Sequence, residues 1–165
     1  AIIGTNSKNI ENIIKKNNLN IEVANDNSPM QVVISGLIKD INTAENFFLS
    51  EGAKRYIKLN VSAAFHSKYM LEAQQKLNNN ITETEFFDGS VPIISNYNSL
   101  INSNKNDIID SLKNQMANKV RWTESIKKLE ETEINHIIEI EPGKILSGLI
   151  SRISKNNYGG KVEII

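Results

Sequence analysis

The order of short apolar runs and helical stripes in residues 1–61 limits the possible folds more than any other feature of the sequence. Strands are expected at residues 2–3, 21–24, 32–34 and 56–61, and helices around residues 10–14 and 44–48. The strand runs are short, rich in Ile and Val, and bounded by turn-forming residues. The helical segments carry apolar side chains at the spacing of one helix face. The order β-α-β-β-α-β predicts a ferredoxin-like subdomain over residues 1–61.

Residues 62–165 have a different sequence pattern, in which longer helical segments alternate with single apolar runs. Helices are expected over residues 67–77, 108–116, 123–129 and 145–153. The continuous apolar run Val91–Ser95 predicts a strand buried on both faces, and Ile137–Ile140 predicts another strand, which stops at Pro142 and Gly143. This alternation indicates part of a parallel α/β sheet, but so few strands cannot complete one. We therefore expect residues 62–165 to be the end of a larger domain.

Charge and composition exclude several classes of site. The chain carries 19 basic and 19 acidic residues, so it lacks the basic excess typical of nucleic-acid-binding proteins. It contains no cysteine, which excludes disulfides and thiolate ligands, and neither histidine stands at metal-ligand spacing from another ligand. No apolar run reaches the length of a membrane span, and no signal peptide opens the chain. We therefore expect a cytoplasmic protein without nucleic-acid, membrane or metal partners.

The sequence has two histidines, and histidine is the side chain that titrates nearest to neutral pH. His66 lies in VSAAFHSKYM, where a strand gives way to a helix; it is either a general base or an exposed histidine near a helix cap. His136 precedes an apolar strand, which favours a structural role. A general base needs a nucleophile, but no serine is framed as G-x-S-x-G, and Ser147 lies within a helix without an evident partner. These residues therefore make up half of an active site at most.

The segment GAKRYIKLNVSAAFHSKYM, residues 52–70, resembles the catalytic-histidine region of malonyl-CoA:acyl carrier protein transacylases. Further stretches agree with this family in the same order: NDNSPMQVVISG (25–36), VPIISNY (91–97), NQMANKVRWTESI (114–126) and EPGKILSGLISRI (141–153). The resemblance covers only the C-terminal part of the family, whose complete members have a ferredoxin-like subdomain inserted into an α/β-hydrolase-like subdomain. It thus implies that residues 62–165 are the C-terminal part of an α/β-hydrolase-like catalytic subdomain, without the nucleophile-bearing part.

The resemblance assigns roles to the residues at matching positions. His66 matches the catalytic histidine, which takes a proton from the serine nucleophile and later serves the attacking thiol. Gln115 matches the glutamine whose backbone carbonyl accepts a hydrogen bond from that imidazole, although spacing alone also fits a surface residue of a helix. Such an acceptor fixes the tautomer and the orientation of the ring in place of the Asp of a catalytic triad.

Further matches concern the acyl pocket. Phe65 precedes His66 as in malonyl-selective members, where a bulky ring restricts α-branched acyl chains; the alternative is a core phenylalanine. Asn27 and Ser28 match a turn beside the pocket, and they are also ordinary turn formers before Pro29. The family's serine elbow, oxyanion-hole glutamine and carboxylate-binding arginine have no match in this chain. We therefore expect this chain alone to be inactive, because the covalent step has no nucleophile.

The function that the resemblance implies is transfer of malonyl from coenzyme A, through a serine ester, to acyl carrier protein in fatty acid biosynthesis. No cofactor is implied beyond the substrate malonyl-CoA, because the partner carries the phosphopantetheine, and we expect a monomer for the complete protein. Carrier proteins are acidic, so Lys54, Arg55, Lys58 and Lys68 form either a docking face or a solvated strand edge. The alternatives are a noncatalytic remnant that keeps only a binding surface, and a piece of a polyketide synthase acyltransferase.

Overall fold

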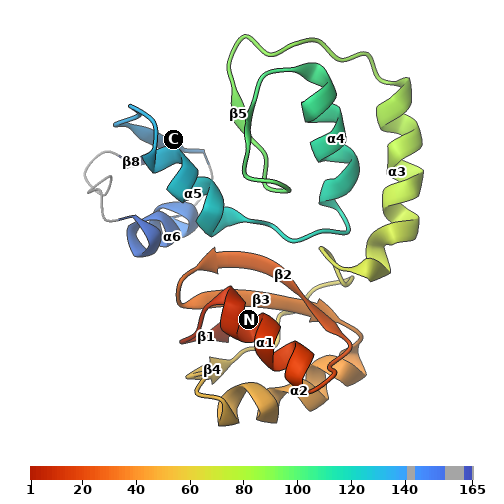
Figure 1. The fold of residues 1–165 in the computed structure, drawn as a ribbon, viewed down its shortest axis with the longest axis vertical. Coiled ribbons are helices and arrows are strands. Elements are labelled where there is room, and N and C mark those ends of the chain that lie inside the picture. Colours follow the sequence, from red (N-terminus) through yellow and green to blue (C-terminus); the bar gives the residue numbers. More distant parts are fainter. Residues whose placement is uncertain (141–143, 155–161, 165) are drawn as a thin grey trace.

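The computed structural model describes residues 1–140, 144–154 and 162–164. Its first part contains a sheet of four strands in the order β2-β3-β1-β4 (Figure 1). The strands and helices of this part are β1 (Ile2–Ile3), α1 (Ser7–Lys16), β2 (Ile21–Ser28), β3 (Gln31–Gly36), α2 (Ile38–Ser50) and β4 (Arg55–Tyr56). Every neighbouring pair of strands is antiparallel. The order of elements and the order of strands confirm the predicted ferredoxin-like pattern.

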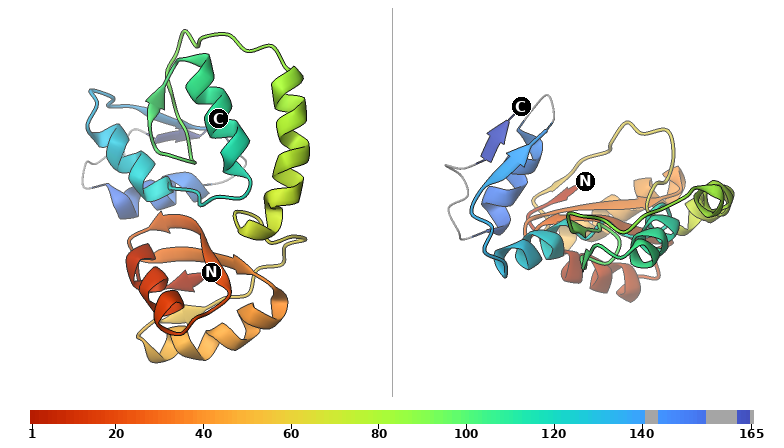
Figure 2. Two further views of the ribbon diagram at one scale, coloured as in Figure 1. Left: turned by 45° about the vertical axis from the view of Figure 1, so that its right-hand side comes forward. Right: turned by 90° about the horizontal axis from the view of Figure 1, so that it is seen from above.

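Both helices cover the same face of this sheet and close its hydrophobic core (Figure 2). Ile10 of α1 and Phe48 of α2 are fully buried. They pack in one cluster with Ile2 and Val32, which the pairing of β1 with β3 places opposite each other. The core therefore follows the helical and strand periodicities of the sequence.

Strand β2 is longer than the expected residues 21–24 and continues through residues that usually form turns. The strand continues to Ser28, so the turn to β3 contains only residues 29–30. Irregularities of register after Val23 and after Asp26 keep the polar residues of β2 paired with β3. Asn and Asp favour turns by local propensity, and pairing with the neighbouring strand overrides that preference here.

Strand β4 is shorter than expected. Leu59 and Val61, which the sequence places in this strand, lie beyond its end at Tyr56 and expose 48% and 64% of their surface. After β4, Ile57 still pairs with Ala1: the N–H of Ile57 donates to the carbonyl of Ala1 at 2.8 Å, and the amine of Ala1 donates to the carbonyl of Ile57 at 2.5 Å. Beyond Ile57 the backbone continues as a loop.

The second part consists of helices and very short strands. They are the 3₁₀ helix η1 (Lys68–Met70), α3 (Leu71–Glu83), β5 (Ile93–Ile94), β6 (Ile101–Asn102), α4 (Lys105–Gln115), α5 (Trp122–Glu130), β7 (Ile137–Glu139), α6 (Ile145–Ile153) and β8 (Val162–Ile164). Helices α3 and α4 lie side by side, whereas α5 packs on α6 and on β2 (Figures 1 and 2). The expected helices are all present. Among the described residues, no helix has the length and apolar character of a membrane span.

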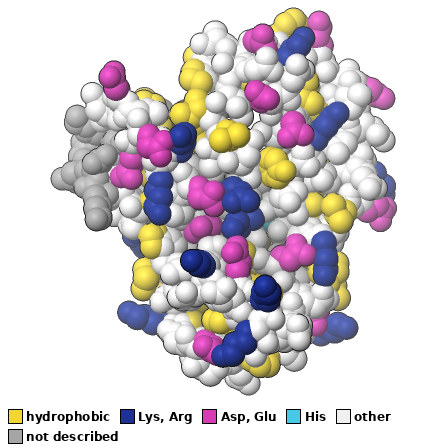
Figure 3. Space-filling model, viewed as in Figure 1, with side chains coloured by type: hydrophobic (Ala, Val, Ile, Leu, Met, Phe, Trp, Pro, Cys, Tyr) yellow, Lys and Arg dark blue, Asp and Glu magenta, His cyan; other side chains and the backbone are white. Residues whose placement is uncertain are grey.

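The strands of the second part differ most from expectation. Within Val91–Ser95 only Ile93–Ile94 forms a strand, and it pairs antiparallel with β6 instead of lying in a buried parallel sheet. Val91 and Ile93 expose 71% and 45% of their surface, because a strand buried on both faces needs covering elements that the described part of the chain does not supply. Hydrophobic side chains accordingly reach the surface in this region (Figure 3). Parallel pairing does occur, between β7, which was expected, and β8, which was not.

Candidate active site

His66 lies in the loop between β4 and η1, in a backbone conformation that residues with side chains rarely adopt. Its φ is +58°, in the left-handed region. Its backbone N–H donates to the carbonyl oxygen of Met116 at 3.0 Å. The next residue, Ser67, is fully buried, and its hydroxyl donates to the carbonyl of Ala64 at 2.6 Å. These contacts on both sides hold the histidine in its unusual conformation.

The ring of His66 faces the C-terminal end of helix α4. Its Nδ1 lies 3.2 Å from the carbonyl oxygen of Gln115, the last residue of α4. Carbonyls in the last turn of a helix have no partner within the helix, so they are available to other groups. His66 contacts two of them, Gln115 through its ring and Met116 through its backbone. Two residues that are 49 positions apart in the sequence thus meet in the structure.

This contact determines which nitrogen of the ring is available for chemistry. A carbonyl oxygen can only accept a hydrogen bond, so Nδ1 of His66 carries the proton that it donates. In the neutral ring, Nε2 then has the free lone pair that a general base needs. The side chain of Gln115 takes no part in this, since its amide donates to the carbonyl of Asn118 at 3.3 Å. The backbone of Gln115 alone supplies the acceptor.

His66 is partly exposed and lines a pocket of about 340 Å³ between the first sheet and the segment that follows α4. The other lining residues come from α1, from the start of β2 and from residues 117–119. At the edge of this pocket, the carboxylate of Glu22 accepts a hydrogen bond from the backbone of Lys68 at 3.0 Å, which anchors the start of η1. Among the described residues, no three His, Cys, Asp or Glu side chains are grouped so that they could hold a metal ion.

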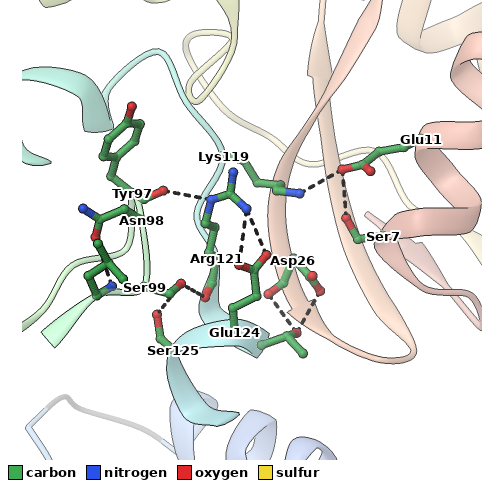
Figure 4. A network of polar contacts seen from close by, with 12 residues as sticks. Ser7, Glu11, Asp26, Tyr97, Asn98, Ser99, Lys119, Arg121, Glu124 and Ser125 are labelled. Atoms are coloured by element: carbon green, nitrogen blue, oxygen red, sulfur yellow. Dashed lines mark hydrogen bonds and ion pairs between the residues drawn. The ribbon is translucent and has the colours of Figure 1, made fainter. Parts of the chain in front are cut away.

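A network of polar contacts ties the segment after α4 to the first sheet (Figure 4). The amine of Lys119 lies 2.8 Å from the carboxylate of Glu11 on α1, and Val120 forms a short bridge with β2. The hydroxyl of Thr123 donates to the carboxylate of Asp26 at 2.8 Å. Burial raises the pKa of Asp26, although the hydrogen bond from Thr123 and the charge of Lys119 oppose this effect. The network holds the segment that follows the acceptor for His66 against the sheet.

The residues expected near the acyl group do not all lie beside His66. Phe65 adjoins it in the chain and exposes 45% of its surface. Asn27 and Ser28 lie at the far end of β2, beyond the stretch that lines the pocket. Ser28 is fully buried, and its hydroxyl accepts a hydrogen bond from the backbone of Met30 at 3.3 Å, as a turn former does.

The basic residues expected to form one docking face lie at opposite edges of the first sheet. Lys54 and Arg55 belong to the β4 edge, and Lys58, which follows, lies 3.9 Å from a carboxylate of α2. The amine of Lys68 instead donates to Asn20 at the start of β2, the other edge. A width of four strands separates these edges by about 14 Å. The structure therefore does not bring these residues together, and basic and acidic side chains are intermingled on the face shown in Figure 3.

Ser147 and His136, the other candidates considered from the sequence, lie away from His66 in the chain, and Ser147 has contacts that spacing did not reveal. The hydroxyl and the backbone N–H of Ser147 both donate to the buried carboxylate of Glu139, so this serine has a partner at the start of α6. His136 is exposed just before β7. The predicted turn at residues 142–143 lies outside the described residues.

The chain is similar in sequence and in structure to known proteins. No protein-family model matches the sequence. The chain is 38% identical over 159 residues to a malonyl CoA-acyl carrier protein transacylase of Bacillus subtilis, covering 94% of this chain and 50% of that protein. Its structure matches an acyl carrier protein S-malonyltransferase from Vibrio cholerae with a TM-score of 0.92 and 31% identity, covering 100% and 54% of the two chains. The chain is homologous to malonyl-CoA:acyl carrier protein transacylases.

The chain spans about half the length of the transacylases that it matches. A third match, with a TM-score of 0.89 and 31% identity, covers 99% of this chain and 53% of the other. It comes from a structure described as a type II polyketide acyl-carrier protein in complex with its malonyl-transacylase. The ferredoxin-like sheet and the α/β elements after it therefore have the fold of part of a transacylase, as the resemblance implied.

Proposed function

We propose that this chain forms the C-terminal part of a malonyl-CoA:acyl carrier protein transacylase and supplies its catalytic histidine. The observation that carries the proposal is the contact of His66 Nδ1 with the carbonyl of Gln115, which leaves Nε2 as the basic nitrogen. A backbone carbonyl orients the ring without placing a negative charge beside it, unlike the aspartate of a catalytic triad. The nucleophilic serine comes from the part of the transacylase that this chain does not span.

In the first half of the proposed reaction, Nε2 of His66 takes the proton of the serine hydroxyl as the serine oxygen attacks the thioester carbonyl of malonyl-CoA. The carbon–sulfur bond breaks, and the leaving thiolate receives the proton from the imidazolium. In the second half, Nε2 takes the proton of the phosphopantetheine thiol, whose sulfur attacks the malonyl-serine ester. The serine oxygen leaves and regains the proton, so that malonyl is bound to the carrier protein and the enzyme returns to its initial state.

The remaining assignments belong to the same proposal. Phe65, exposed beside His66, borders the acyl group and disfavours α-branched chains. Asn27 and Ser28 support the acyl pocket from the end of β2. The carrier protein brings its own phosphopantetheine, so the reaction needs no cofactor beyond malonyl-CoA, and it takes place in the cytoplasm. We expect the complete enzyme to act as a monomer.

The test is a transfer assay with the complete protein that contains this chain. Labelled malonyl-CoA is supplied first alone and then with phosphopantetheinylated acyl carrier protein. We expect an alkali-labile malonyl ester on the protein in the first case and labelled carrier protein in the second. A protein that folds but forms neither product is instead a noncatalytic remnant. Comparing carrier proteins of fatty acid and polyketide synthesis then decides which pathway the enzyme serves.

A further inference from the structure

Side chains of α3 determine where helix α4 ends. If α4 continued, the backbone N–H of Ala117 would donate to the carbonyl of Lys113. Instead it donates to Oε1 of Gln74 at 2.9 Å, in a buried contact between residues 43 positions apart. The carbonyl of Lys113 lies 3.1 Å from the side-chain nitrogen of Asn78, in the amide orientation that satisfies its neighbours. Gln74 and Asn78 are one turn apart on the same face of α3, so together they terminate α4.

This termination makes the acceptor for His66 available. A helix that continued beyond Met116 would use the carbonyls of Gln115 and Met116 for its own hydrogen bonds. Because α4 stops, these carbonyls face the ring and the backbone N–H of His66. The loop that carries His66 leads through η1 directly into α3. The same stretch of chain thus holds both the histidine and the amide that stops α4.

Gln74 is buried, and its side-chain oxygen is needed as the acceptor for the N–H of Ala117. Only 7% of its surface is exposed, although glutamine is usually exposed. An apolar side chain of the same length would fill the space but would leave the N–H of Ala117 without an acceptor. A buried N–H without an acceptor is unfavourable, so the end of α4 would have to move to find another partner.

We propose that Gln74, assisted by Asn78, is a positioning residue that fixes the carbonyl of Gln115 and thereby the tautomer and orientation of the His66 ring. The effect of Gln74 on catalysis rests on the proposed function, whereas its effect on the tautomer of His66 does not. A shift of the carbonyl away from Nδ1 would leave both neutral tautomers populated and the ring free to turn, and small misplacements of a reacting group are costly to rate.

The test compares Gln74→Met with Gln75→Met in the complete protein. Gln75 is the neighbouring residue on α3 and is exposed, so it controls for the change of residue type. The first readout is the pair of ¹⁵N imidazole shifts of His66, which reports the tautomer. The second readout is kcat and KM for malonyl transfer. For Gln74→Met we expect a mixed tautomer and a fall in kcat of about tenfold, with KM changed by less than about twofold.

Gln75→Met is expected to behave as the parent in both readouts. Identical ring shifts in Gln74→Met and Gln75→Met would overturn the proposal. If the complete protein shows no malonyl transfer, the proposed function fails, and the ring shifts still decide the role of Gln74. If Gln74→Met does not fold, Asn78→Ala against the exposed neighbour Asn79→Ala takes its place. A mixed tautomer in Asn78→Ala alone supports the proposal, and equal shifts in the two variants contradict it.

Discussion

The hydroxyl of Ser67 donates to the carbonyl of Ala64 at 2.6 Å, across His66 with its left-handed backbone. Ser67 is fully buried, so this hydrogen bond has no competition from water. It closes the loop tightly around the histidine and thereby offsets the conformational cost of the positive φ.

Replacing Ser67 by Ala should therefore lower the free energy of unfolding of the complete protein by about 1–3 kcal/mol, because the Ala64 carbonyl loses its partner. The measurement is the midpoint of urea unfolding. Ser62→Ala, which changes an exposed serine of the same loop, should leave the midpoint unchanged. Equal midpoints for the two variants would show that the hydrogen bond does not stabilise the loop.

The raised pKa of Asp26 predicts a stability that depends on pH. Because burial raises the folded-state pKa above the unfolded value, the protonated form contributes stability at low pH. That contribution is lost as the pH rises from the unfolded pKa through the folded pKa. Asn at this position keeps an oxygen for the hydroxyl of Thr123 and cannot ionise.

Asp26→Asn should consequently melt at a higher temperature than the parent at neutral pH, and the difference should shrink as the pH falls toward about 4. Thermal melts of both proteins over this range test the sign. A variant that is less stable than the parent at neutral pH would show that the attraction between the charge of Lys119 and the ionised Asp26 outweighs the effect of burial.

Carrier-protein docking should distinguish the two edges of the first sheet. Lys68 lies two residues after His66 at the β2 edge, whereas Arg55 lies on β4 at the other edge. Lys68→Gln should raise the KM for carrier protein about two- to fivefold at low ionic strength and weaken its salt dependence. Arg55→Gln should change neither, and transfer to a small thiol should be normal in both. Equal effects of the two substitutions would favour a docking face that spans both edges.

The exposed apolar side chains predict how the 165-residue chain behaves by itself. Phe87, Val91 and Ile140 expose 73%, 71% and 81% of their surface, far more than side chains of a completed core. The purified chain should bind a dye for exposed apolar surface and melt over a broad temperature range. A sharp cooperative transition without dye binding would show that these elements are stable without further covering.

Local patterns predicted the first sheet well, because each of its elements buries one periodic face within residues 1–61. The errors concern the strand ends: pairing with β3 carries Asn and Asp of β2 through a strand, and β4 ends at Tyr56, before Leu59 and Val61. The run Val91–Ser95 has the sequence of a buried strand, but the residues that would cover it are not in the described chain. Burial depends on the surroundings, which a local sequence pattern does not contain.

The candidate site was predictable only in part. The position of His66 at a strand-to-helix junction suggested a base, but spacing alone could not choose Gln115 among surface residues of a helix. That choice came from the resemblance to transacylases. The roles of Gln74 and of the pair formed by Glu11 and Lys119 depend on contacts between distant segments, and no local signal marks them.

We propose above that His66 is the general base of a malonyl transacylase. The most direct test is the rate of malonyl transfer from malonyl-CoA to acyl carrier protein by the complete protein with His66→Ala, beside the control His136→Ala. We expect a fall of about 10²- to 10⁴-fold for His66→Ala and a parental rate for His136→Ala, with both variants folded. A folded His66→Ala protein that transfers malonyl at the parental rate would contradict the proposal.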